Sequence, residues 1–215
     1  STLKGIEVLE KLGSITHVIK IRTDQILPAG LLSWLEDFYT NGNRETIASP
    51  LGTNMCDHFV VPWLLSSRPF YFGDFFWAAH IKDLSIFCGS NLHQKRPLHP
   101  NIEQDLCVSY LAGIDPSFKR KFSNILTTCA NLVFNQSMIE AWMKYVGRVF
   151  VPAPNKFFEQ VIWRGRLLSD VFPNKGSFLF YEDIIANPEV GFSRVTFFDL
   201  WRDFRRYVTF LLKQP

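Results

Sequence analysis

Residues 17–25 read HVIKIRTDQ, a short apolar run that ends in a charged turn. Runs of about four to eight residues rich in Val and Ile, bounded by turn formers, are typical of buried strands. Lys20 and Arg22 are two residues apart, so on a strand they share one face, and Asp24 follows if the chain stays extended. Unpaired buried charge is costly, so these cations must meet anionic partners. The stretch therefore predicts either a structural ion pair or a ligand site, since α/β sheets place ligands at the carboxyl ends of their strands.

The composition is that of an ordinary globular protein. The chain has 215 residues, of which 47% are hydrophobic and 20% charged, which suits one domain with a substantial core. A formal net charge of +3, without a compact run of Lys and Arg, argues against a nucleic-acid partner. Aromatic residues are frequent, with 21 Phe, 6 Trp and 6 Tyr, which favours wide clefts or a partner surface in addition to the core.

The cysteine spacing and the lack of a signal-peptide pattern indicate the cellular compartment. The four cysteines form no CxxC pair (Cys56, Cys88, Cys107 and Cys129). We expect buried thiols in a reducing compartment, with a disulfide as the alternative. No apolar run reaches the ~18 residues of a membrane span and no signal-peptide pattern is present, so we expect a cytoplasmic protein. The chain lacks an initial Met and enters directly into a helical pattern, which favours a fragment of a longer protein.

The order of the expected elements indicates an α/β fold. Helices are expected over residues 1–13 and 28–38, the second beginning at Pro28. Strands are expected within 17–25 and at 46–49, where Pro50 ends the second. A strand, a helix and a strand in this order predict a βαβ-type unit in a partly parallel sheet.

The rest of the chain mixes both element types. Residues 50–68 are expected to form a long loop with a short apolar piece at 59–65. Further strands are expected at 69–74, 148–152 and 176–183. Further helices are expected over 77–87, from Pro100 onward, across most of 117–147, over 157–171 and over 197–212. The last of these is basic and aromatic, and it either packs its rings inward or rests on an anionic membrane at the inner face.

No familiar catalytic signature is present, and acids at the ends of elements are the main chemical feature. The sequence has no P-loop, GxGxxG, GxSxG or HExxH motif, and the histidines show no metal-ligand spacing. The acids at element ends are Asp24, Asp74, Asp83, Glu103, Glu182 and Asp183. Each alone is more typical of a cap or a surface carboxylate. Their positions after apolar strands favour Asp24 and Asp74 as functional groups.

Three blocks of sequence resemble one family of sugar transferases. The first block combines STLKG at 1–5 with VIKIRTD at 18–24, and the second runs from PFYFGDFFW at 69–77 to KDL at 82–84. A weaker third block is PNIEQ at 100–104. Over about residues 1–110, the chain is similar to the WavE-type lipopolysaccharide synthesis family, sugar transferases of bacterial surface polysaccharides and some viruses. The string KIRTD is the most specific part of this resemblance.

The resemblance implies a fold and an activity. The fold is a GT-A-like, Rossmann-like mixed sheet flanked by helices in a single domain, residues 1–215. Residues 1–115 form its motif-bearing α/β part and residues 116–215 a mainly helical acceptor-side part. The N-terminal strands that bind the nucleotide base and ribose would be missing. The activity is a hexosyltransferase type, which moves a sugar from a nucleotide-sugar donor to a polysaccharide or lipopolysaccharide, as a glycan or lipid-linked glycan acceptor.

The resemblance also assigns the donor side of the site. Asp24 matches the acid that holds a divalent cation, Mn²⁺ or Mg²⁺, against the donor diphosphate. Lys20, Arg22 and Thr23 belong to the same diphosphate site. The string Arg22-Thr23-Asp24 offers one carboxylate where the usual motif has two, so a metal-free alternative stays open in which Arg22 or Lys20 neutralises the leaving group.

The acceptor side needs a base, because the acceptor hydroxyl loses its proton during transfer. The candidate catalytic bases are Asp74 and Glu103, and Asp74 is favoured because a Gly-Asp turn after a strand would expose it. An enzyme that retains the anomeric configuration needs neither. Acceptor binding is assigned to Phe75, Trp77 and Asp83, with core packing as the other role of such aromatic rings. The alternative function is a non-catalytic carbohydrate-binding or assembly module, in which Asp24 and Asp74 would not converge.

Overall fold

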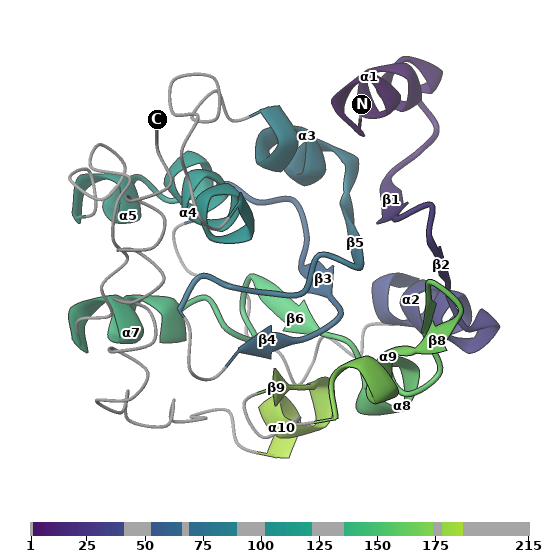
Figure 1. Cartoon of the computed structure of the whole chain (residues 1–215). Helices are drawn as coiled ribbons and strands as arrows, with labels where there is room; N and C mark the ends of the chain where they lie inside the picture. Colours follow the sequence, from purple (N-terminus) through teal and green to yellow (C-terminus); the bar gives the residue numbers. More distant parts are fainter. Residues whose placement is uncertain are drawn as a thin grey trace, which may run out of the picture.

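A mixed four-stranded sheet lies at the centre of the computed structural model, which describes residues 2–40, 53–65, 69–89, 102–121, 136–173 and 178–186 (Figure 1). The strand order is β1 (His17–Ile21), β5 (Phe76–His80), β3 (Phe59–Val61) and β6 (Phe150–Pro152). β5 runs antiparallel to both of its neighbours, whereas β3 and β6 are parallel. β1, β3 and β6 therefore run in one direction, and their carboxyl ends lie at the same edge of the sheet.

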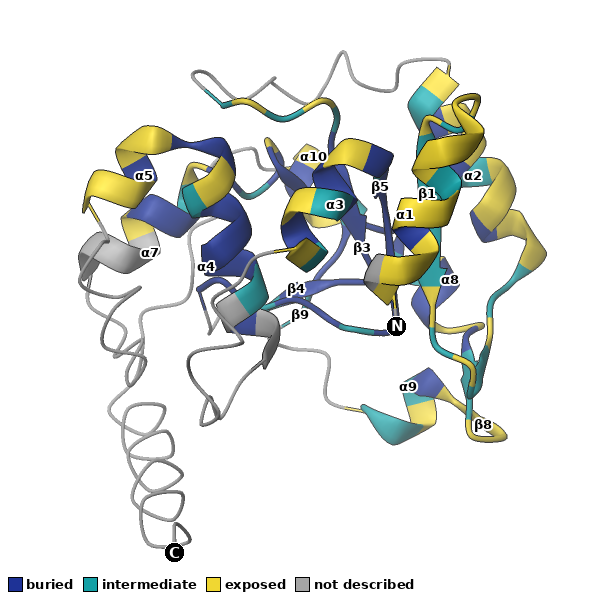
Figure 2. Cartoon of the chain, turned by 90° about the horizontal axis from the view of Figure 1, so that it is seen from above, coloured by how far each residue is buried: buried dark blue, intermediate teal, exposed yellow. Residues whose placement is uncertain are grey.

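The two central strands are buried on both faces, because successive side chains of a strand point to opposite sides. Phe59 and Val61 of β3 belong to one hydrophobic core, and Val60 between them belongs to another. β5 alternates in the same way, with Trp77 in the first core and Phe76 in the second. Figure 2 shows these strands in dark blue, inside a shell of partly exposed helices.

Helices supply the other wall of each core. Their bounds are α1 (Thr2–Leu12), α2 (Ala29–Thr40), α3 (Ile81–Gly89), α4 (Ile102–Ile114), α5 (Pro116–Lys121) and α7 (Gln136–Met143). α2 closes the second core with Leu31, Leu35 and Phe38, three or four residues apart on one face. The other five contribute to the first core. The described chain is thus an α/β fold with a mixed sheet flanked by helices, which confirms the class predicted from the sequence.

Shorter elements surround the carboxyl edge of the central sheet. β2 (Gln25–Ile26) pairs with the hairpin of β7 (Ile162–Trp163) and β8 (Arg166–Leu167), and β4 (Leu64–Leu65) pairs with β9 (Phe178–Leu179). Three short helices complete this region. α8 (Asn155–Phe158) lies between β6 and β7, α9 (Leu168–Val171) lies between β8 and β9, and α10 (Tyr181–Ala186) follows β9. A third, mainly aromatic core fills this region, with Trp63 stacked on Phe178.

Several predicted elements are confirmed, and two helices are wrong in part. The helices at 1–13 and 28–38, the strand within 17–25, the helix after Pro100 and the strand at 148–152 are confirmed as α1, α2, β1, α4 and β6. The helix expected over 77–87 begins only at Ile81, because residues 76–80 form the central strand β5. The helix expected over 157–171 is instead the β7–β8 hairpin between α8 and α9.

One loop prediction and two strand predictions also need correction. The apolar piece at 59–65 forms β3 and β4 rather than part of a loop. In the stretch 69–74 only Phe72 makes a β-bridge, to Leu64, so Asp74 precedes a strand and does not follow one. The strand expected over 176–183 includes only Phe178–Leu179, and the acids after it lie in the first turn of α10. The strand predicted at 46–49 and the basic helix predicted over 197–212 lie outside the described residues.

The structure shows how far three of the cysteines are buried and whether a described helix could span a membrane. Cys107 is buried and Cys88 is half-buried, but Cys56 is exposed, so the prediction of a buried thiol is wrong there. The three are free thiols, and Cys129 lies outside the described residues. Within the described ranges, every helix is too short or too polar to traverse a lipid bilayer.

Asp115 immediately precedes α5 and caps its N-terminus. One of its carboxylate oxygens accepts the N–H groups of Ser117 (2.7 Å) and Phe118 (3.3 Å), and the other accepts the hydroxyl of Tyr145 (2.7 Å). Asp115→Ala removes the helix cap and leaves the buried Tyr145 hydroxyl without this acceptor. We expect a loss of about 1–3 kcal/mol in the free energy of unfolding, measured by urea denaturation at pH 7.

The same contribution should depend on pH. Burial raises the pKa of Asp115, but the hydrogen bonds from Tyr145, Ser117 and Phe118 outweigh it and hold the pKa below its usual 3.8. A lowered folded-state pKa adds stability above the unfolded-state pKa and loses it as the pH falls through the folded-state value. The difference between wild type and Asp115→Ala should therefore be full at pH 7 and smaller below about pH 4. Asp115→Asn, which keeps a cap oxygen, should be milder than Asp115→Ala, and an equal loss in both would contradict the capping role.

Candidate functional site

Polar side chains gather at the two opposite ends of the β1–β5 ladder. In this ladder His17 pairs with His80 at one end, and Ile21 pairs with Phe76 at the other. Four intervals of about 3.3 Å separate the two ends by roughly 13 Å. We call the group at the Ile21 end the arginine–aspartate cluster (Lys20, Arg22, Asp24, Asp74, Trp163 and Arg164) and the group at the His17 end the histidine cluster (His17, Cys56, Asp57, His80 and Asp83).

The guanidinium of Arg22 joins two carboxylates that are far apart in the sequence. Its Nη1 donates to Asp74 Oδ2 at 2.9 Å, and its Nε and Nη2 donate to the two oxygens of Asp24 at 3.0 and 3.3 Å. The planar fork of Arg suits such bidentate pairing with a carboxylate. The side chains of all three residues are about one-third exposed, so this arrangement lies at the surface of the domain.

The β7–β8 hairpin fastens Asp24 from another side. Trp163 Nε1 and Arg164 Nε each donate to Asp24 Oδ2 at 3.0 Å, and the backbone N–H of Arg164 donates to the Asp24 carbonyl. The hairpin loop is Arg164-Gly165, and both residues have positive φ, 52° and 77°, as two-residue hairpin loops often require. The left-handed backbone at Arg164 is strained for a residue with a side chain. Here it directs a guanidinium onto Asp24.

These donors decide the charge state of Asp24. The hydrogen bonds from Arg22 lower the pKa most, burial opposes them as the next largest effect, and the hydrogen bonds from Arg164 and Trp163 lower the pKa further. Together they hold the pKa of Asp24 well below its ordinary value. The positively charged guanidinium groups of Arg22 and Arg164 face the carboxylate, and Arg22 lies between the two acids where a bridging cation would lie. The residues present therefore fit a Mn²⁺ or Mg²⁺ ion at Asp24 poorly, which favours the metal-free alternative.

Lys20 adds a further cation to the same cluster. Its Nζ donates to the carbonyl oxygen of Asp74 at 3.2 Å and lies 4.2 Å from the centroid of the Trp77 ring. Among the described residues, this cluster contains the three cations Lys20, Arg22 and Arg164 and the two carboxylates Asp24 and Asp74. The side chain of Arg164 is 66% exposed, so its guanidinium is accessible to an anion from solvent while it also pairs with Asp24.

The remaining predicted site residues lie elsewhere or serve the core. Thr23 is exposed in the turn between β1 and β2. Phe75 and Trp77 are 5% and 7% exposed, and their rings pack against Trp63 and Phe87, so core packing and not sugar stacking is the role that their burial supports. Asp83 belongs to the histidine cluster. Glu103 lies in α4, and its side chain is not among those described.

Gly73, which precedes Asp74, lies too close to the ring of Trp63 to carry a side chain. A Cβ at residue 73 would lie 2.8–2.9 Å from three ring atoms of Trp63, whose side chain is buried. Neither the indole nor the backbone can give way without repacking the aromatic core. Gly73→Ala should therefore lower the free energy of unfolding by about 1–3 kcal/mol, measured by chemical denaturation.

Gly5 is the matched control for that substitution. It lies in exposed α1, and a Cβ there would meet nothing within 4 Å. Gly5→Ala should stabilise the protein by about 0.5–1 kcal/mol, since Ala is the better helix former. Equal effects of the two substitutions would mean that the Trp63 contact does not limit residue 73.

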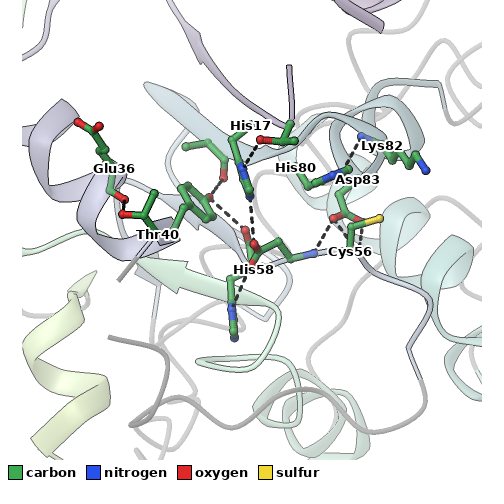
Figure 3. Close-up of polar contacts among 12 residues, drawn as sticks. His17, Glu36, Thr40, Cys56, His58, His80, Lys82 and Asp83 are labelled. Carbon is green, nitrogen blue, oxygen red and sulfur yellow. Dashed lines mark hydrogen bonds and ion pairs between the residues drawn. The ribbon is translucent and has the colours of Figure 1, made fainter. Parts of the chain in front are cut away.

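The histidine cluster lies at the opposite edge of the sheet, and Figure 3 shows its contacts. His17 Nε2 is 3.0 Å from Asp57 Oδ2, and the ring of His17 lies edge-on to that of His80 at 5.4 Å. Asp83, in the first turn of α3, accepts backbone N–H groups from Cys56 and Asp57 at 3.0–3.1 Å. The loop before β3 is thus tied to the start of α3.

Three side chains of this cluster could hold a metal ion. Cys56, His80 and Asp83 each offer one ligand atom, and these atoms lie within 4.8 Å of one another. Histidine spacing does not predict this group, because only one of its three members is a histidine. The available signal was the pair His80 and Asp83, three residues apart at a helix start and hence on one side of it.

We compared the chain with known proteins. No protein-family model, curated protein or solved structure gives a significant match. The function is therefore inferred from the chemistry of the two clusters.

Proposed function

We propose that this chain is a glycosyltransferase with a GT-A-like fold. It would move a sugar from a nucleotide-sugar donor to a cell-surface polysaccharide or lipopolysaccharide acceptor. The observation that carries the proposal is the meeting of Asp24 and Asp74 on Arg22, since a non-catalytic module would not need the two acids to converge.

The position of the cluster in the fold supports the proposal. Asp24 follows the carboxyl end of β1, and β3 and β6 end at the same edge of the sheet. Ligands of open α/β sheets bind outside the carboxyl ends of strands, because loops there are free to vary around a fixed scaffold. The histidine cluster lies at the other edge, so the arginine–aspartate cluster is the better candidate for the donor.

The charges of the cluster suit a diphosphate. A nucleotide sugar releases a nucleoside diphosphate, and fixed cations stabilise the charge that develops on it. Arg164, the most exposed cation of the cluster, would contact the diphosphate, with Arg22 and Lys20 beneath it. Asp24 orients Arg22 through two hydrogen bonds and Arg164 through one, so it is a positioning residue.

Asp74 is the group that would receive the acceptor proton. Its carboxylate is about one-third exposed, and among the described residues only Arg22 is hydrogen-bonded to it. A carboxylate within reach of the acceptor hydroxyl can serve as general base, while the hydrogen bond from Arg22 keeps it oriented.

The test is a turnover assay with a panel of uridine, guanosine, cytidine and thymidine nucleotide sugars and bacterial glycan acceptors. We expect release of the nucleotide from one donor class, with transfer of its sugar to the acceptor. Binding of a glycan without turnover of any donor would instead support the carbohydrate-binding module.

A further inference from the structure

Asp83 is the most unusual charged group in the described part of the chain. Its side chain is fully buried. The backbone N–H groups of Cys56 and Asp57 donate to it and the Tyr110 hydroxyl interacts with it, but no described Lys, Arg or His side chain forms an ion pair with it. Buried carboxylates are normally paired with a cation or coordinate a metal ion, because isolated buried charge is costly.

The neighbours of Asp83 are both metal-ligand types. His80 ends β5 and Cys56 lies in the loop before β3, and with Asp83 they place three ligand atoms within 4.8 Å of one another. Around a tetrahedral ion with bonds of about 2.0–2.3 Å, ligand atoms are roughly 3.5 Å apart. A side-chain movement of about 1 Å would close the site.

We propose that Cys56, His80 and Asp83 bind a Zn²⁺ ion. A thiolate, an imidazole and a carboxylate form the mixed sulfur, nitrogen and oxygen set that Zn²⁺ favours, whereas Mg²⁺ and Mn²⁺ favour oxygen ligands. Binding releases the Cys56 thiol proton to solvent and gives the site two anionic ligands. These outweigh the partial positive charge at the N-terminus of α3, which is about half an elementary charge.

Backbone groups next to the cluster orient the Asp83 carboxylate by hydrogen bonds. The N–H groups of Cys56 and Asp57 fix the Asp83 carboxylate. Outer hydrogen bonds of this kind orient metal ligands and tune their affinity. The N–H of Lys82, which donates to His80 Nδ1 at 3.2 Å, gives up this bond when an imidazole nitrogen of His80 binds the ion. Cys56 is exposed, which gives the ion a path from solvent and leaves a fourth position for water.

The site is distinct from the proposed donor site. It lies at the opposite end of the β1–β5 ladder, and its chemistry does not suit the hard cations that assist nucleotide-sugar chemistry. The inference therefore does not depend on the proposed function.

The test measures metal binding without any enzymatic assay. The purified protein is stripped with a chelator, titrated with Zn²⁺ or Co²⁺, and examined by elemental analysis, thermal shift and Co²⁺ absorption. We expect one Zn²⁺ per chain, a rise in melting temperature with Zn²⁺ but not Mg²⁺, and a Co²⁺–thiolate charge-transfer band. Cys56→Ser and His80→Asn should each lower Zn²⁺ affinity by at least about 100-fold, since loss of an outer hydrogen bond alone costs 10–100-fold.

Cys88→Ser is the matched control, since Cys88 is a free thiol at the far end of α3. It should keep both the Zn²⁺ stoichiometry and the charge-transfer band. The proposal is overturned if the wild type takes up no Zn²⁺, or if Cys56→Ser and His80→Asn bind it as tightly as the wild type does.

Discussion

Replacing Asp74 by Asn will lower the rate of sugar transfer by about 10²- to 10⁴-fold, the contribution usual for a general base. The Asn side chain has nearly the same shape, and its amide oxygen still accepts the hydrogen bond from Arg22 Nη1. It cannot accept the acceptor proton. The measurement is kcat/KM for the donor and acceptor pair found in the panel, with circular dichroism as a check on folding.

Asp170→Asn is the control for this substitution, because Asp170 is an exposed acid in α9, outside the proposed site. It should retain the wild-type rate. If Asp74→Asn also keeps its rate within about twofold, Asp74 is not the base.

The second large effect is expected at Arg22. Arg22→Met removes the group that joins Asp24 and Asp74, so the two acids repel an approaching diphosphate. Hydrogen bonds to charged groups are worth about 1.5–3 kcal/mol, so donor affinity should fall roughly 10- to 150-fold. Arg22→Lys keeps the charge but loses the fork and should lie between the two.

The same substitution has a spectroscopic consequence. Hydrogen bonds from Arg22 are the largest cause that holds the pKa of Asp24 low, followed among the lowering causes by those from Arg164 and Trp163. In Arg22→Met the pKa of Asp24 should move up towards its ordinary value, which NMR titration of the carboxyl carbon can follow. An unchanged pKa would mean that the hairpin alone sets the charge of Asp24.

Local patterns predicted those parts of the fold that local physics determines. The spacing of Leu31, Leu35 and Phe38 gave a correct helix because it buries one recognisable face. The apolar run HVIKI gave a correct strand because it is short and ends at a charged turn. The run FWAAH failed because β5 is buried on both faces, and a continuous apolar run fits a buried helix equally well. The hairpin at 162–167 failed because its strands have two residues each, too few for a pattern.

The candidate sites depend on contacts that no local pattern contains. Asp24 and Asp74 both accept hydrogen bonds from Arg22, although Asp74 stands before a strand and not after one. Trp163 and Arg164 were not expected there, because they reach Asp24 across some 139 residues of sequence. Cys56 meets His80 and Asp83 only because β3 lies beside β5.

Calorimetric titration with the panel of nucleotide sugars shows directly whether the arginine–aspartate cluster binds the donor. The proteins compared are the wild type, Arg22→Met and Arg148→Met. Arg148 is an exposed Arg near β6 and leaves the cluster untouched. We predict that one donor class binds the wild type and Arg148→Met equally, and that it binds Arg22→Met at least about 10-fold more weakly. If no nucleotide sugar binds the wild type, or if Arg22→Met binds the donor as tightly, the arginine–aspartate cluster is not a donor site.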